Sequence, residues 1–224
     1  MNVRREVVPF LAATWVLVGV VLVLGLVFGV GPYRLSIPMV GFGLVMSGYF
    51  LYFFRDPERT VPAGVQNLVA PADGVVARIV RMREDQYLKA DTVRISIFLS
   101  LFDVHVNRSP LAGQGTFLGY FPGKRLFTFH EKSSDVNQHN SILIEGSGTR
   151  CLLNQIVGPV CRRVVYWPDH NRPVALAGGE RIGMMKFGSR LDLYFPDGDV
   201  TITAREGDRV SAGASVIGQV KGTR

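Results

Sequence analysis

The stretch KFGSRLDLYFP, residues 186–196, predicts a β-strand with an unusual beginning. Residues 190–195 alternate in the way that is typical of strands. The triplet Gly188-Ser189-Arg190 interrupts this apolar run, and a glycine there indicates a bulge or a close backbone approach. Two interpretations of Ser189 stay open at this point: it is part of the bulge, or it carries chemistry.

Short β-prone runs continue through the chain after residue 56. The predicted strands cover residues 74–80, 92–100, 141–146, 190–195 and 199–204. The PDGD between the last two predicts a hairpin, whereas residues 151–167 fit either a broken helix or two strands. Glycines punctuate residues 205–220 as in the hammerhead hairpins of lipoyl-type domains. Together these patterns predict a mainly β (α+β) fold with a compact β-barrel or sandwich-like body.

The N-terminal quarter differs in composition from the rest. Residues 7–33 carry no charge, and a second uncharged run covers residues 35–54. Each run is long enough to cross a bilayer as a helix. We therefore expect two transmembrane helices at about 7–30 and 35–54, with a membrane hairpin at 1–55 and a β-rich body at 56–224. A cleaved signal peptide and a re-entrant segment are the alternatives.

The basic residues around the hairpin predict its orientation. Those outside its ends are Arg4, Arg5, Arg55 and Arg59, whereas Arg34 alone lies in the turn. The positive-inside tendency then places both termini and the body on the cytoplasmic face of the cell (inner) membrane. The net charge of +7 fits contact with anionic lipids. Nucleic acid is not an expected partner, because the sequence has no Arg/Lys-rich helix and no aromatic RNA-binding motif.

The residues that bind metals are sparse and scattered. Cys151 and Cys161 lack CxxC spacing, and a cytoplasmic body would keep them reduced. The four histidines show no zinc-site spacing. The sequence therefore predicts no metal site.

The Gly188-Ser189 pair has the groups needed for an intramolecular acyl shift. The Ser189 hydroxyl can attack the Gly188 carbonyl if the backbone bends, and glycine tolerates the strained conformations that this requires. The resulting ester can eliminate to dehydroalanine, which hydrolyses to ammonia and a pyruvoyl group. Such a ketone acts as an electron sink. Gly146-Ser147 is a rival pair in a segment that resembles a loose turn.

Asp73 and His105 are the candidate partners of Ser189. Asp73 lies in PADGVV, where Asp-Gly also reads as a turn signal, and its functional interpretation is a carboxylate that orients a histidine. His105 follows an apolar strand. It can be structural, or it can act as the general base for Ser189 and later as a proton donor.

Six motifs follow one another from about residue 53. They are FFRDPER, PADGVV, SLFDVHVNRSP, FPGKRLFTFHEKSSDVNQHNS, NQIVGPVCRRVV and ERIGMMKFGSRLDLYFP. The chain thereby resembles the short-form phosphatidylserine decarboxylase proenzymes of bacteria and archaea. This resemblance implies self-cleavage between Gly188 and Ser189, giving a β chain (1–188) and an α chain (189–224) that stay associated. It also implies a covalent pyruvoyl cofactor made from Ser189, which forms a Schiff base with the amine of phosphatidylserine.

The resemblance also implies roles for individual residues. Asp73 and His105 assist self-cleavage, and His105 helps to protonate the intermediate after carbon dioxide leaves, so that phosphatidylethanolamine is released. We expect four basic residues to contact the lipid phosphate or carboxylate: Arg108, Lys124, Arg125 and Arg190. Arg108 stands where the longer-form enzymes carry a second histidine. The segment KSSDVNQHN departs from the usual KASxxNERN, and His139 within it is not expected to be catalytic.

Two other classes of function compete with this interpretation. A membrane-anchored lipoyl-like adaptor without enzymatic activity would explain the hairpin and residues 205–220, but not residues 181–196. A serine hydrolase would use Ser189, His105 and Asp73 without cleavage, although the sequence lacks a GxSxG elbow at Ser189. Exposed strand edges favour a homodimer.

Overall fold

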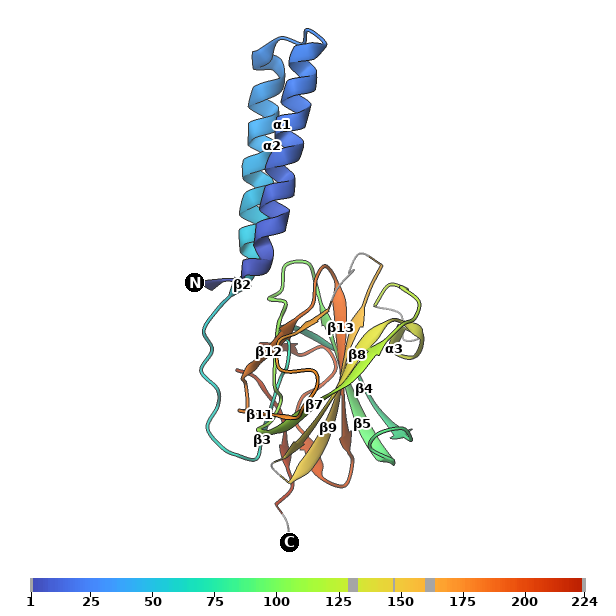
Figure 1. Cartoon of the computed structure of the whole chain (residues 1–224). Helices are drawn as coiled ribbons and strands as arrows, with labels where there is room; N and C mark the ends of the chain where they lie inside the picture. The colour runs from blue at the N-terminus through green and yellow to red at the C-terminus, as the bar shows by residue number, and fades with distance from the viewer. Residues whose placement is uncertain (1, 129–132, 147, 160–163, 223–224) are drawn as a thin grey trace. The chain divides into compact units, whose positions relative to one another are not determined.

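The computed structural model describes residues 2–128, 133–146, 148–159 and 164–222. The chain divides into two compact units, residues 1–58 and 59–224, which we call the hairpin unit and the body (Figure 1). The hairpin unit is helical and the body is mainly β, as predicted. Cys161 and Ser147 lie outside the described residues.

Two apolar helices dominate the hairpin unit. They are α1 (Val8–Val27) and α2 (Pro32–Phe53), and a short 3-10 turn at Arg5–Val7 precedes α1. Both are long and apolar enough to cross a bilayer. α2 begins at Pro32, earlier than predicted, because proline suits the first turn of a helix. Pro38 lies inside α2 without ending it.

Small residues let the two helices pack closely. The Trp15 indole nitrogen donates to the Ser47 hydroxyl at 3.2 Å, and that hydroxyl donates to the Gly43 carbonyl at 2.7 Å. A Cβ at Gly43 would come within 3.2 Å of the Trp15 ring. Small and hydroxyl-bearing residues are the usual contacts between helices in lipid. Beyond the helices, β1 (Asn2–Val3) pairs with β2 (Arg55–Asp56) and ties the two ends together.

The body consists of fourteen strands and one short helix among the residues that the structure describes. The elements up to β9 are β3 (Asn67–Val69), β4 (Gly74–Glu84), β5 (Ala90–Leu99), β6 (Val106–Arg108), β7 (Gly113–Phe121), α3 (Ser133–Val136), β8 (His139–Gly146) and β9 (Thr149–Val157). The remaining strands are β10 (Val165–Tyr166), β11 (Val174–Leu176), β12 (Arg181–Met184), β13 (Ser189–Pro196), β14 (Val200–Ile202), β15 (Arg209–Val210) and β16 (Val216–Val220).

One antiparallel sheet of eight strands carries the body. Its order is β11-β7-β8-β9-β13-β5-β4-β15, and two three-stranded sheets, β10-β12-β6 and β14-β16-β3, accompany it (Figure 1). The sheets are not closed into a barrel, so the sandwich-like alternative describes the packing better. Residues of all three sheets share one buried apolar cluster.

β13 is a central strand of the large sheet and is buried on both faces. Leu191, Leu193 and Phe195 point into the main core, as strand alternation requires. The opposite face carries Arg190 and Asp192, which are also buried. Because β13 pairs with β5 on one side and with β9 on the other, its register is fixed twice.

Two details of the predicted strand pattern need revision. The prediction of a PDGD hairpin is wrong, because β13 pairs with β5 and β9, whereas β14 pairs with β16 in another sheet. The turn itself forms, since the Asp199 amide donates to the Pro196 carbonyl at 3.0 Å. In residues 151–167, the described part forms strands in β9 and β10, so the two-strand alternative holds there.

Cys151 provides a test of the packing of β9. Its side chain is completely buried, and burial raises the pKa of the thiol well above its ordinary value, with a smaller opposing effect from a hydrogen bond to the Tyr194 backbone. We expect iodoacetamide at pH 8 to leave Cys151 unmodified in the folded protein and to modify it fully in urea, as read by peptide mass spectrometry. Modification of the folded protein at the rate of an exposed thiol would contradict this packing.

Candidate functional site

The candidate residues gather at the end of the large sheet where β13 begins. Ser189 is the first residue of β13, and it pairs with Leu99 at the end of β5 and with Val157 at the end of β9. The Met185 amide, just before this turn, donates to the His105 carbonyl at 3.1 Å. The strand ladders therefore bring His105 and Ser189 to the same end of the body.

The backbone before Ser189 is left-handed at two successive residues. Phe187 has a φ of +55° and Gly188 a φ of +70°. Positive φ is uncommon for a bulky residue such as phenylalanine and marks strain that the surroundings must hold. Space is not the constraint at Gly188, because a Cβ there would approach nothing closer than Leu101 at 4.0 Å. The glycine is required by the backbone conformation.

The Ser189 hydroxyl is buried without a hydrogen-bond partner among the described residues. A buried polar group in this condition costs free energy and calls for an explanation. The carbonyl of Gly188 lies close to Gly158, where an added Cβ would come within 2.9 Å of that oxygen. The glycine at 158 therefore leaves space beside the carbonyl. The left-handed turn therefore places a buried hydroxyl directly after the Gly188 carbonyl, as an acyl shift requires.

His105 is fully buried, and its ring is oriented by the backbone. Its Nδ1 atom lies 2.9 Å from the Asp103 carbonyl oxygen. A carbonyl can only accept, so Nδ1 carries a proton, and in the neutral tautomer the lone pair then lies on Nε2. The Asp103 carboxylate shapes the same turn by accepting from the Ser100 amide at 2.8 Å and from the Ser100 hydroxyl at 2.7 Å.

Asp73 lies just before β4 and holds two other segments of the body. Its carboxylate accepts from the Ala212 amide at 2.7 Å and pairs with the Arg59 guanidinium at 2.7 Å. Asp73 and His105 both lie beside strands of the body, β4 and β6. The orientation of His105 by Asp73 stays a prediction. The hydrogen bonds given above join Asp73 to Ala212 and Arg59, and His105 to the Asp103 carbonyl.

A loop between β7 and β8 is fastened beside Gly188 and Ser189. The Asn137 side chain bonds both the amide and the carbonyl of Leu126, at 2.9 and 2.7 Å, and donates to the Val157 carbonyl at 2.9 Å. Thr128 on the same loop is buried near Gly158. Asn137 therefore links the loop to the strand that pairs with Ser189.

The four predicted lipid-binding residues fall into two groups. Lys124 and Arg125 are exposed on the loop that Asn137 fastens. Arg108 and Arg190 are buried; Arg108 donates to the Gly179 carbonyl at 3.0 Å. Arg190 forms an ion pair with Asp192 at 2.8 Å, and the Ser134 hydroxyl donates to the same carboxylate at 2.6 Å. Their burial favours positioning roles for Arg108 and Arg190.

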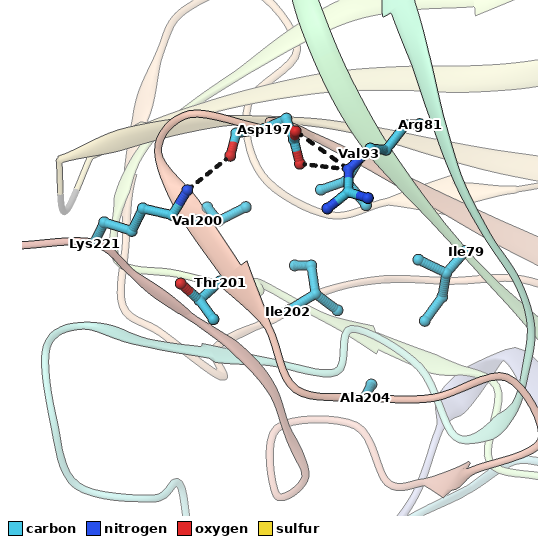
Figure 2. Close-up of a pocket in the computed structure, with 9 residues that line it drawn as sticks. All are labelled: Ile79, Arg81, Val93, Asp197, Val200, Thr201, Ile202, Ala204 and Lys221. Carbon is cyan, nitrogen blue, oxygen red and sulfur yellow. Dashed lines mark hydrogen bonds and ion pairs between the residues drawn. The ribbon is translucent and has the colours of Figure 1, made fainter.

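Two cavities lie away from these residues. A cavity of about 370 Å³ opens on the other face of the large sheet, where His139 stacks on Phe121 with ring centroids 5.1 Å apart. Figure 2 shows a cavity of about 580 Å³ near the far end of β13, with Arg81 and Lys221 both bonded to Asp197. None of the candidate catalytic residues is among the described residues that line either cavity.

Sequence reasoning missed two residues that the structure places at the site. Arg59 was counted only as a charge flanking the membrane hairpin, yet it pairs with Asp73. Asn137 was part of a quoted motif without a role. A signal existed for both, since Arg59 directly follows FFRDPE and Asn137 lies in KSSDVNQHN, but nothing in the residues alone specified the partners.

Comparison with known proteins gives one consistent family. A family model described as phosphatidylserine decarboxylase matches residues 46–218. The phosphatidylserine decarboxylase proenzyme of Solibacter usitatus is 43% identical over 182 residues, covering 80% of this chain and 83% of the relative. The proenzyme of Carboxydothermus hydrogenoformans is 41% identical over 174 residues, covering 78% and 81%. That of Amoebophilus asiaticus is 37% identical over 200 residues, covering 88% and 87%.

The contribution of the Asn137 side chain can be tested by removing it. Asn137→Ala deletes three hydrogen bonds and leaves buried backbone groups unsatisfied, so we expect a loss of about 1–3 kcal/mol in the free energy of unfolding. Thermal unfolding of the purified protein in detergent measures this loss. The exposed residue Asn171 provides the control, and equal melting temperatures for Asn137→Ala and Asn171→Ala would contradict the proposed link.

Proposed function

The chain belongs to the phosphatidylserine decarboxylase family, and we propose that it converts phosphatidylserine to phosphatidylethanolamine after cleaving itself between Gly188 and Ser189. The observation that carries this proposal is the left-handed turn at Phe187 and Gly188, followed by a buried Ser189 hydroxyl. The strain of this turn lies at Phe187, directly before the Gly188–Ser189 unit that reacts. A non-enzymatic adaptor does not require such a turn, and the nucleophile elbow of a serine hydrolase is a strand-to-helix turn, whereas Ser189 begins a strand.

Self-cleavage uses only groups of this chain and one water molecule. The Ser189 oxygen bonds to the Gly188 carbonyl carbon, the Gly188–Ser189 C–N bond breaks, and the freed nitrogen takes up the proton that the hydroxyl loses, so that it becomes an amine. Loss of the Ser189 α-proton then breaks the Cβ–O bond, which leaves a carboxylate on Gly188 and dehydroalanine at position 189. Tautomerisation and addition of water release ammonia and leave a ketone.

His105 supplies the proton transfers in this proposal. Its ring donates through Nδ1 to the Asp103 carbonyl, so Nε2 is the atom that accepts the Ser189 proton. The same atom later delivers a proton to the former α-carbon of the substrate. We retain Asp73 as the carboxylate that supports His105, and its bond from the Ala212 amide fixes its position.

Ser189 fits the role of precursor to a pyruvoyl group, because its hydroxyl is buried beside a glycine in the left-handed conformation and has no described partner. A pyruvoyl group at this position supplies an electron sink for the electron pair that remains when the substrate carboxylate leaves as carbon dioxide. The protein's contribution is a buried position that keeps water away, with His105 oriented at the same end of the sheet.

The strand order supports continued association of the two fragments. Residues 189–224 contain β13, which lies between β9 and β5 of the larger fragment. β15 pairs with β4 and β16 pairs with β3, so the smaller fragment is held by hydrogen-bonded ladders in two sheets. Cleavage before Ser189 breaks no ladder.

The remaining assignments concern the membrane and the lipid. Two apolar helices indicate membrane association. We propose the cytoplasmic face of the inner membrane from the arginine distribution, and contact with the lipid phosphate by Lys124 and Arg125, which are exposed on the loop fastened beside Gly188. A homodimer stays a prediction; the large sheet ends at two short edge strands, β11 and β15.

Ser189→Ala tests the proposed cleavage directly. We expect the wild-type protein to copurify as two fragments and to separate under denaturing conditions, the smaller being residues 189–224 with a ketone at its N-terminus. Without the hydroxyl, Ser189→Ala should remain one chain and show no detectable decarboxylation. Intact mass spectrometry and lipid analysis measure both results.

Ser147→Ala is the matched control for this experiment and should process normally. A wild-type chain that stays unsplit through purification and prolonged incubation would refute the decarboxylase and favour the adaptor or the hydrolase. Normal splitting of Ser189→Ala would move the cleavage to another residue, with Ser147 the first to examine.

His105→Ala tests the proton transfers. Removing a general base typically slows a reaction by about 10²–10⁴-fold, and we expect self-cleavage to slow within that range. A time course of fragment formation measures the rate, with His139→Ala as a control because His139 lies on the other sheet face, stacked on Phe121. Normal processing together with full lipid turnover in His105→Ala would remove its assigned role.

A further inference from the structure

The exposed apolar side chains of the body gather at one end. Among its described residues, eight large apolar side chains are exposed, and five of these lie near the start of β13: Leu101, Phe102, Tyr120, Leu126 and Phe127. Phe102 is 67% exposed and Phe127 is 56% exposed. Single exposed apolar residues are ordinary, but a group of them marks a contact surface.

The strand ladders bring these five residues to the same end of the sheet. Leu101 and Phe102 follow β5, whose last residue, Leu99, pairs with Ser189. Tyr120 precedes Phe121, the last residue of β7, which pairs with His139. His139 in turn pairs with Ile156, the residue next to the partner of Ser189. We call the two segments 100–102 and 120–127 the apolar rim.

The positive charge of the apolar rim favours a negatively charged partner. Lys124 and Arg125 are exposed between the aromatic residues of the second segment. Asp103 is the only acidic residue in 100–105 and 119–128, all of which the structure describes, and its buried carboxylate is engaged by Ser100. Aromatic residues beside lysine and arginine suit the interface of a bilayer that contains anionic lipids.

The apolar hairpin unit, once inserted in a bilayer, tethers the body close to the lipid surface. Residues 54–58 are all that separates the end of α2 from Arg59, where the body begins. A hairpin inserted in lipid therefore keeps the body at the membrane surface. A water-soluble protein partner would not explain why the apolar end of the body is also the end that holds Gly188 and Ser189.

We propose that the apolar rim inserts into the surface of an anionic bilayer and presents the end of the body that holds Ser189 to lipid headgroups. The biological role of this insertion rests on the proposed function, whereas the insertion itself can be measured without it. Insertion lets the substrate keep its acyl chains in the membrane while its headgroup enters the site. Lys124 and Arg125 hold the rim at the negatively charged headgroup layer.

Spin labels can measure this insertion without any turnover. The full chain carrying Cys161→Ser is reconstituted in vesicles of equal parts phosphatidylglycerol and phosphatidylcholine and labelled at Phe102→Cys or at Phe127→Cys. We expect both labels to be more accessible to oxygen than to a water-soluble nickel chelate. Met82→Cys is the control: Met82 is also exposed, but it pairs with Thr92 at the other end of β5, so its label should favour the chelate.

Two outcomes would overturn the proposal. Equal aqueous accessibility at all three positions would show that the rim does not enter lipid. Shielding of the rim labels from both probes would indicate burial against protein, such as a second copy of the chain. Because the labels report on insertion alone, the measurement remains decisive even if the protein proves to have another activity.

A kinetic experiment connects the rim to the reaction. Phe102→Ser combined with Phe127→Ser should lower decarboxylation of phosphatidylserine in vesicles by at least about tenfold, as expected when two aromatic side chains that insert into lipid are removed. The rate with dispersed short-chain phosphatidylserine in detergent should stay at the wild-type level. Equal rates for variant and wild type on vesicles would contradict the role of the rim, whereas failure of the wild type on both substrates would refute the proposed function instead.

Discussion

The left-handed backbone at Phe187 and Gly188 is the constraint on which the rest of the site depends. Such a conformation costs about 1–3 kcal/mol at a residue other than glycine and persists only where the neighbouring structure fixes it. Here, the Met185 amide is bonded to His105 on one side, and Ser189 enters ladders with two strands on the other. The chain must turn between these fixed points, so the stability of the sheet holds the left-handed turn beside the Ser189 hydroxyl.

A buried ion pair keeps this arrangement in register. Arg190 and Asp192 lie on the face of β13 opposite Ser189, and they bond to each other and to the Ser96 and Ser134 hydroxyls. Burying two charges is costly unless hydrogen bonds satisfy them, as they do here. A slip of one residue would move both charges into the apolar core and turn Ser189 to the other face. The ion pair therefore disfavours a slip of register and helps to fix the position of Ser189.

Features with a local cause could be predicted from the sequence, and features with a tertiary cause could not. Uncharged runs identified both apolar helices, and alternation identified β13, because each pattern follows from the apolar surroundings of the side chains. The PDGD turn was visible, but a turn signal does not say which strands will pair, and β14 joined β16 instead. The exposure of Phe102 and Phe127 could not be predicted either, because an apolar residue in a sequence predicts burial until the packing around it is known.

The ion pair between Arg59 and Asp73 shows that the segment after α2 is attached to the body. By composition this segment is a spacer, but Arg59 bonds to the Asp73 carboxylate at 2.7 Å. Two residues later, Val61 packs so closely on Gly179 that a Cβ there would clash with it, and the Gly179 carbonyl accepts from Arg108 at 3.0 Å. The segment that follows α2 is thus fixed to the body both at Asp73 and beside Gly179. A change in this segment therefore disturbs the contacts of Asp73 and of the loop that Arg108 bonds, in addition to changing the length of the connection.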